Sequence, residues 1–113
     1  MQYRLVTFTV ADEATASDAQ KMGSFELRGL SLPTIDSATI GFQISVDGTT
    51  FRTVYTNSGT PAALTLGTAD TGAKFVAIPD EVARATPGMQ VKLTFGAAQN
   101  GGPYSIVGVL EKV

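Results

Sequence analysis

Residues 38–55 read ATIGFQISVDGTTFRTVY, and this stretch carries the clearest pattern in the chain. Its first half alternates apolar side chains with small or polar ones, and the apolar positions are Ile40, Phe42, Ile44 and Val46. Because successive side chains of a β-strand point to opposite faces, this alternation predicts a strand with one apolar face.

The centre of the same stretch predicts a tight turn. Asp47 is followed by Gly48, and glycine adopts a positive φ without steric cost. An Asp-Gly pair between two alternating runs is a strong signal for a two-residue hairpin turn. The alternation resumes at Phe51 and Thr53. We therefore predict one β-hairpin over residues 38–55, with Asp47-Gly48 as its turn.

The rest of the chain repeats short alternating runs that are separated by turn signals. Pro33 ends one run, because proline lacks the amide proton that a strand ladder needs. Further strands are expected at residues 4–10, 24–30, 63–66, 75–78, 89–95 and 104–112. In the strand at 4–10, Val6, Phe8 and Val10 share the face that we expect to be buried.

Three segments between these runs are expected to be loops or turns. The small and acidic residues at 11–23 predict an exposed loop, with a brief helical turn over 14–22 as an alternative. Residues 68–72 predict a turn. Residues 79–84 predict one helical turn, with Asp80 and Glu81 near its positive end.

About eight short strands at roughly ten-residue intervals, with at most one short helical turn, are typical of a sandwich or barrel. We therefore predict an all-β fold: a single domain over residues 1–113, built as an antiparallel, jelly-roll-like β-sandwich. Its core is expected to take the aromatic rings, which bury large apolar areas. These are Phe8, Phe25, Phe42, Phe51, Phe75 and Phe95.

Composition narrows the functional classes. The chain has 113 residues, of which 16% are charged, and its net charge is −2 with the basic residues dispersed. This predicts neither a nucleic-acid footprint nor a membrane span, and we expect no secretory signal. A chain without cysteine forms no disulfide, so its redox compartment stays open. A surface poor in charge favours contact with another protein.

The residue types argue against catalysis and metal binding. The chain has no histidine and no Ser-x-x-Lys spacing, so a nucleophilic serine hydroxyl has neither of these bases as a partner. Asp47-Gly48 resembles the start of a calcium loop, but the positions that follow lack carboxylates. Adjacent Asp80 and Glu81 suit a helix end better than an acid–base pair. We expect no enzyme activity, no cofactor and no metal.

Partner contact is the remaining role for exposed side chains. Tyrosine is enriched at interfaces, because its ring is apolar and its hydroxyl is polar. Tyr3, Tyr55 and Tyr104 are therefore candidates, together with Arg4 and Leu5. Residues 1–10 contain a leading strand with two mixed faces, and we expect it at an edge or at an oligomer interface.

Four stretches resemble small virion proteins of tailed bacteriophages, namely the capsid decoration (cement) and head-fibre-base proteins. They are residues 27–33 (LRGLSLP), 38–51, 75–79 (FVAIP) and 91–95 (VKLTF). The likeness covers roughly residues 25–112. The chain departs from the family at 94–98 (TFGAA), where the family often has a basic, Ser-Gly element.

The resemblance implies a jelly-roll-like sandwich on the outside of a phage head, assembled in the cytoplasm of a bacterial host. It implies a homotrimer that contacts the major capsid protein and stabilises the shell by repeated non-catalytic contacts. Two alternatives stay open at this point: a phage tail or baseplate adaptor, and a carbohydrate-binding β-sandwich module with an exposed aromatic platform.

Overall fold

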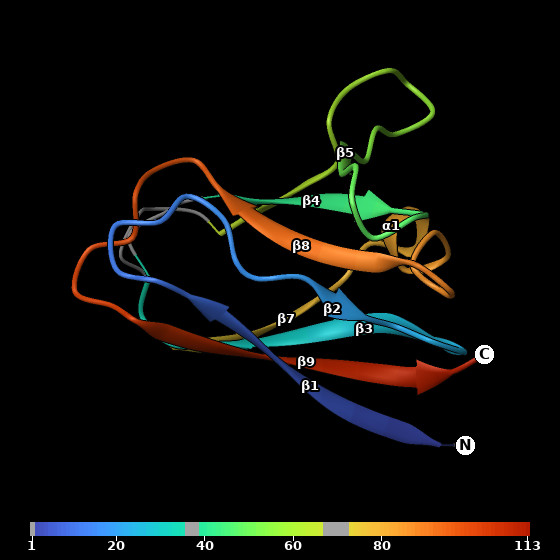
Figure 1. The fold of residues 1–113 in the computed structure, drawn as a ribbon, viewed down its shortest axis with the longest axis horizontal. Helices are drawn as coiled ribbons and strands as arrows, with labels where there is room; N and C mark the ends of the chain where they lie inside the picture. The colour runs from blue at the N-terminus through green and yellow to red at the C-terminus, as the bar shows by residue number, and fades with distance from the viewer. Residues whose placement is uncertain (1, 36–38, 67–72) are drawn as a thin grey trace.

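A computed structural model describes residues 2–35, 39–66 and 73–113. This part of the chain forms two antiparallel sheets that pack face to face, and one helical turn lies beside them (Figure 1). The elements are β1 (Tyr3–Val10), β2 (Gln20–Lys21), β3 (Phe25–Leu32), β4 (Thr39–Ser45), β5 (Arg52–Thr53), β6 (Ala63–Thr65), β7 (Lys74–Ala77), α1 (Asp80–Ala83), β8 (Gln90–Phe95) and β9 (Tyr104–Lys112).

The strands pair in a nested order. β1 pairs with β9, β2 with β8, β3 with β7, and β4 with both β5 and β6. Two further pairs, β3–β9 and β4–β8, join these strand pairs into sheets. The result is one sheet in the order β1-β9-β3-β7 and one in the order β2-β8-β4-β5, with β6 beside β4. Such a nested pair of sheets is a jelly roll, so the prediction of an all-β, jelly-roll-like sandwich is confirmed.

The core lies between the two sheets. Alternation along β1 turns Phe8 and Val10 inward, as predicted, and both are fully buried. β8 and β9 contribute in the same way, each with one face buried. Burying a large apolar side chain contributes about 1.5–3 kcal/mol. The largest fully buried apolar side chains are Phe8, Phe42, Met22, Leu27, Leu30, Ile35, Ile40, Leu93, Ile106 and Leu110.

The predicted hairpin forms between β4 and β5, and Gly48 has the expected positive φ (81°), but the turn is not the tight one that was predicted. The last residue pair between β4 and β5 is Ile44 with Arg52, so a longer loop joins the two strands. Asp47 accepts hydrogen bonds from the main-chain N–H groups of Thr49 (2.8 Å) and Thr50 (2.9 Å). These bonds satisfy the main chain locally and compete with the ladder. Val46 was expected to share the apolar face of the strand, but it follows the end of β4 and is solvent-exposed. Ala38 lies outside the described residues.

The segment before β2 forms no helical turn among its described residues. Instead it runs in extended form beside β8. The Ser17 N–H donates to the carbonyl of Leu93 (2.9 Å), and the Ser17 hydroxyl accepts from the N–H of Leu93 (2.9 Å). Ser17 is buried, and both its backbone and its side chain thus pair with β8. The alternative of a helix over 14–22 fails because these contacts hold the chain extended.

Other sequence expectations agree with the structure. β3 ends at Leu32, directly before Pro33. The single helical turn, α1, follows Pro79 and carries Asp80 and Glu81 in its first turn. β9 covers the residues predicted for the last strand, and both ends of the chain lie on the same side of the sandwich (Figure 1). The turn predicted at 68–72 lies outside the described residues.

Candidate functional site

One face of the β1-β9-β3-β7 sheet points to solvent, and it carries exposed apolar side chains on β1, the predicted leading strand. Tyr3 and Leu5 point outward from β1, with 60% and 66% of each side chain exposed. Leu5 lies opposite Val109 of β9, and Val109 in turn lies opposite Gly29 of β3. Residues that lie opposite one another in an antiparallel pair share a face, so these side chains form one row across the sheet.

A second row runs parallel to the first. Thr7 of β1 lies opposite Val107 of β9, Val107 lies opposite Ser31 of β3, and Ser31 lies opposite Phe75 of β7. None of these four side chains is charged. The two rows together form an uncharged, partly apolar surface, which we call the outer face.

Phe75 is the aromatic anchor of the outer face, although the sequence placed it in the core. Its side chain is 62% exposed, and that prediction is therefore wrong. Val76 is the half-buried neighbour that packs against the core instead. A Cβ at Gly29 would clash with Cζ of Phe75, so the tip of the ring lies over this glycine. The missing side chain of Gly29 thereby makes room for the Phe75 ring.

Two other phenylalanines that were expected in the core are only half-buried. Arg4 lies over the ring of Phe25, with its Cζ 4.8 Å from the ring centroid. Lys92 lies over Phe51, with its Nζ 4.3 Å from the centroid. Phe25 thus packs at the margin of the core, whereas Phe51 is not among the residues that pack against it, and each ring is covered by a cation. The prediction of full burial holds for Phe8 and Phe42 and, with 8% exposure, for Phe95.

Charged groups border the outer face. Arg28 sits at a bulge in β3, between the paired residues Leu27 and Gly29. Its guanidinium contacts Glu26 and Asp80, with N–O distances of 3.3 Å to each. These pairs are partly exposed and contribute little to stability. They place charge beside the face but leave its centre uncharged.

The structure separates the five predicted contact residues. Tyr3 and Leu5 share the outer face, whereas the Arg4 guanidinium folds back and donates to the carbonyls of Lys21 (3.1 Å) and Met22 (3.2 Å). Tyr104 begins β9, and its hydroxyl donates to the carbonyl of Asn100. Tyr55 follows β5 in the opposite sheet. Sequence reasoning also missed Phe75, Val107 and Val109 as members of the outer face.

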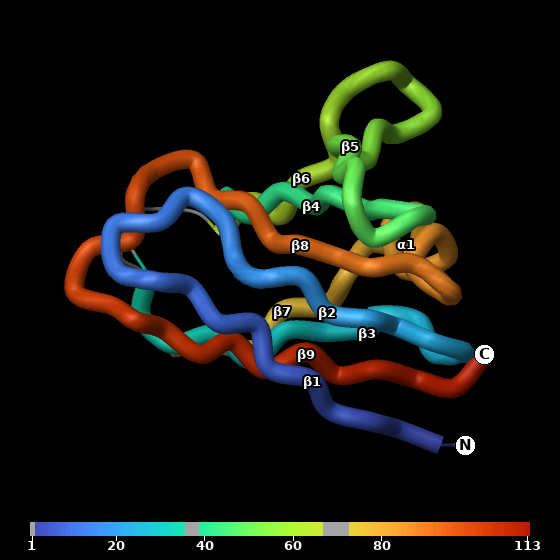
Figure 2. Tube along the Cα trace, viewed as in Figure 1, coloured from blue at the N-terminus to red at the C-terminus, as the bar shows by residue number. Residues whose placement is uncertain are grey.

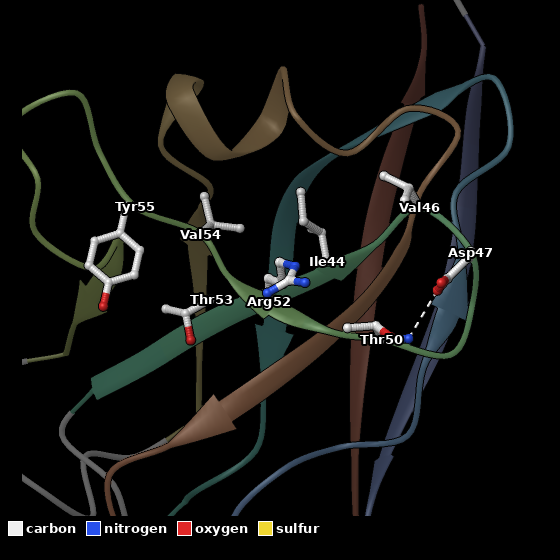
Figure 3. Close-up of a pocket in the computed structure, with 8 residues that line it drawn as sticks. All are labelled: Ile44, Val46, Asp47, Thr50, Arg52, Thr53, Val54 and Tyr55. Carbon is white, nitrogen blue, oxygen red and sulfur yellow. Dashed lines mark hydrogen bonds between the residues drawn. The ribbon is translucent and has the colours of Figure 1, made fainter.

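Tyr55 lines a pocket of about 520 Å³ beside the β4–β5 connection (Figure 3). Ile44 and Val54 form an apolar part of its wall, and Arg52 and Thr53 add polar groups. The pocket offers a cation and hydroxyls but neither an imidazole nor a thiol, because the chain has no histidine or cysteine. The pocket lies beside the β2-β8-β4-β5 sheet, and none of its lining residues belongs to the outer face.

Asp47 lines one end of this pocket, and its carboxylate accepts hydrogen bonds from its own loop. Hydrogen bonds from the N–H groups of Thr50 and Thr49, and then from the Ser45 hydroxyl, lower the pKa of Asp47 from 3.8 to about 2. Figure 3 shows the bond from Thr50. A carboxylate that accepts several hydrogen bonds stays ionised to lower pH, because the bonds favour its charged form.

This pKa predicts the pH dependence of one substitution. The folded pKa of Asp47 lies below its unfolded value, so its contribution is present above pH 3.8 and is lost as the pH falls toward about 2. Asp47→Asn keeps an acceptor oxygen but carries no charge. We expect wild type to be more stable than this variant at neutral pH, and the difference to shrink in acid. Urea unfolding at several pH values measures it; a difference independent of pH would contradict the assignment.

Metal ligation and membrane spanning find no support in the described residues. No group of three or more His, Cys, Asp or Glu side chains in residues 2–35, 39–66 and 73–113 is placed to hold a metal ion. Within the same part of the chain, no helix has the length and apolar character to cross a membrane.

Comparison with known proteins identifies no relative. No family model, no curated protein and no solved structure matches the chain.

Proposed function

We propose that this chain is a non-catalytic structural protein that decorates the outside of a tailed-phage capsid and binds the major capsid protein through the outer face. The supporting observation is the surface formed by Leu5, Val109 and Phe75, which is apolar, uncharged at its centre and bordered by charges. Exposed apolar patches with a polar rim are typical of protein-contact sites.

The geometry suits adhesion for a further reason. The outer face lies on paired strands, so its backbone is already ordered and loses little conformational entropy on binding. The ring of Phe75 is already positioned over Gly29. A contact of this kind needs no catalytic group. Repeated around a shell, weak contacts sum to a strong one, which is how a small protein stabilises a capsid against internal pressure.

One pair of variants tests this proposal. Phe75→Lys replaces the aromatic anchor of the outer face with a charge, whereas Val46→Lys places the same charge on an exposed apolar residue of the opposite sheet's loop. Both positions are solvent-exposed, with 62% and 81% of the side chain accessible, so both variants should fold. We expect Phe75→Lys to abolish co-sedimentation with undecorated shells of the major capsid protein from the same phage.

The control variant should bind those shells as wild type does. If Phe75→Lys binds the shells as tightly as Val46→Lys, the outer face is not the contact surface. Shells are the probe because they distinguish a capsid protein from a tail or baseplate adaptor, which would remain in the supernatant. The adaptor proposal would then be tested with tail fractions.

The carbohydrate-binding alternative needs an exposed aromatic platform. Tyr55 and Tyr104 do not form one together, because they lie beside strands of different sheets. These two tyrosines therefore do not supply the platform that sugar binding needs.

A further inference from the structure

The free edge of β1 presents unpaired main-chain groups. Thr9 donates its N–H to the carboxylate of Asp18 (2.8 Å) and accepts from the N–H of Asp18 (3.0 Å), so both groups point away from β9. Gln2, by contrast, accepts from the N–H of Lys112 (2.8 Å), so its carbonyl points toward β9. Main-chain groups of successive residues in a strand alternate between its two edges. Leu5 and Thr7 therefore present their N–H and C=O groups at the free edge.

These groups have no partner in the described part of the chain. Figures 1 and 2 show β1 at the margin of its layer, with β9 on its inner side. An open edge of this kind is a template for another strand. The Arg4 side chain does not block it, because its guanidinium is bonded to the carbonyls of Lys21 and Met22. An extended strand therefore fits beside Leu5 and Thr7.

We infer that this edge pairs with the same edge of a second copy of the chain, antiparallel and about a two-fold axis at Leu5. Leu5 then lies opposite Leu5 of the second copy, and each donates its N–H to the other's carbonyl. Thr7 lies opposite Tyr3 of the second copy. The four-stranded sheets of both copies join into one continuous sheet.

Charge and hydrogen bonding select this register over its neighbours. A shift in one direction places Arg4 directly opposite Arg4 of the second copy, and like charges in that position are destabilising. A shift in the other direction places Tyr3 opposite Thr9, whose N–H and C=O are already bonded to Asp18. In the chosen register, Arg4 lies opposite the uncharged Val6 of the second copy. The edge is thus complementary to itself, which favours a second copy over an unrelated strand.

The pairing extends the outer face. Residues that lie opposite one another in an antiparallel pair point to the same side of the sheet, so both outer faces point the same way. The two Leu5 side chains meet at the axis, and the row from Leu5 to Val109 continues into its symmetry copy. The dimer depends on the chain alone and not on shell binding, and it differs from the trimer that the sequence resemblance implies.

Proline at position 7 tests the edge selectively. Thr7→Pro removes an N–H that the β1–β9 ladder does not use and places a ring carbon at the free edge, which edge strands tolerate. Thr7→Val is the control, because it keeps the N–H and the β-branched shape. Sedimentation equilibrium should give wild type and Thr7→Val a mass that approaches two chains with rising concentration. Thr7→Pro should dissociate about tenfold more readily or worse.

Two further variants distinguish dimer formation from shell binding. Leu5→Lys places two cations opposite each other at the axis, so it should weaken the dimer even if Thr7→Pro fails to fold. Phe75→Lys lies away from the edge and should leave the dimer intact while it abolishes shell binding. A wild-type mass of one chain at every concentration, a mass of three chains, or a Thr7→Pro dimer as tight as wild type would each overturn the inference.

Discussion

Replacing Phe42 with alanine is expected to lower the free energy of unfolding by about 3–5 kcal/mol. Phe42 is fully buried in β4, where it lies opposite Leu93 of β8 at the centre of the core. The loss combines the transfer of the ring to water with the cavity that it leaves, because the two sheets cannot close around the gap. A loss of this size is a large share of the 5–15 kcal/mol that stabilises an ordinary domain.

Phe51→Ala is the matched control for this prediction. Phe51 is the same residue type and was also expected in the core, but it is half-buried in the loop before β5 and covered by Lys92. Its removal loses partial burial and one cation–π contact, which together contribute about 1–2 kcal/mol. Urea unfolding of both variants measures the difference. Equal losses would show that the core does not lie between β4 and the opposite sheet as described.

Thr86→Val is expected to lower the free energy of unfolding by about 1–3 kcal/mol, although the side chain keeps its size. Thr86 is fully buried, and its hydroxyl accepts from the N–H of Leu27 (2.9 Å) and donates to the carbonyl of Ala83 (2.7 Å). The pairing of β7 with β3 ends at Gly29, so the N–H of Leu27 has no strand partner on that side. Valine would leave this buried donor unsatisfied.

Thr86→Ser separates the hydroxyl from the methyl group. Serine keeps the donor and acceptor and loses only the methyl contact, so it should retain more stability than valine at this position. Thr65→Val provides the surface reference, because Thr65 is exposed on β6 and no hydrogen bond of its side chain is found in the described part of the chain. Thermal unfolding ranks the three variants. The account of Thr86 fails if Thr86→Val is as stable as wild type or Thr86→Ser is the worse of the two.

Strand positions were predictable because alternation is a local signal. β9 occupies residues 104–112 as predicted, and β1 differs from the predicted strand only by the addition of Tyr3. The pairing of these strands was not predictable in the same way. Thr86 stabilises Leu27 across 59 positions of sequence, and no periodicity within either segment indicates such a contact.

The errors have equally local causes. β7 is four residues long, and Phe75 and Val76 are both apolar, so the alternation does not decide which of them faces the core. At the β4–β5 connection, Asp-Gly predicted a two-residue turn, but the side chains of Ser45 and Asp47 form their own hydrogen bonds and end the ladder early.

The candidate site was predictable only in part. Tyr3 was a candidate both as a tyrosine and as part of the leading strand, Leu5 only as part of that strand, and both are on the outer face. Tyr55 and Tyr104 were chosen for their residue type, which says nothing about which sheet carries them. The row that joins Leu5 to Val109 and Gly29 depends on strand register, which only the fold supplies.

Saturation binding to undecorated capsid shells tests the central claim, that this chain acts by adhesion. Increasing amounts of wild-type protein would be sedimented with shells of the major capsid protein from the same phage, and the pelleted ratio of the two proteins measured. The account predicts that the ratio rises to a fixed plateau and that the shells then withstand higher temperature before they rupture. Protein that stays in the supernatant at every concentration, or that binds without any change in rupture temperature, would contradict it.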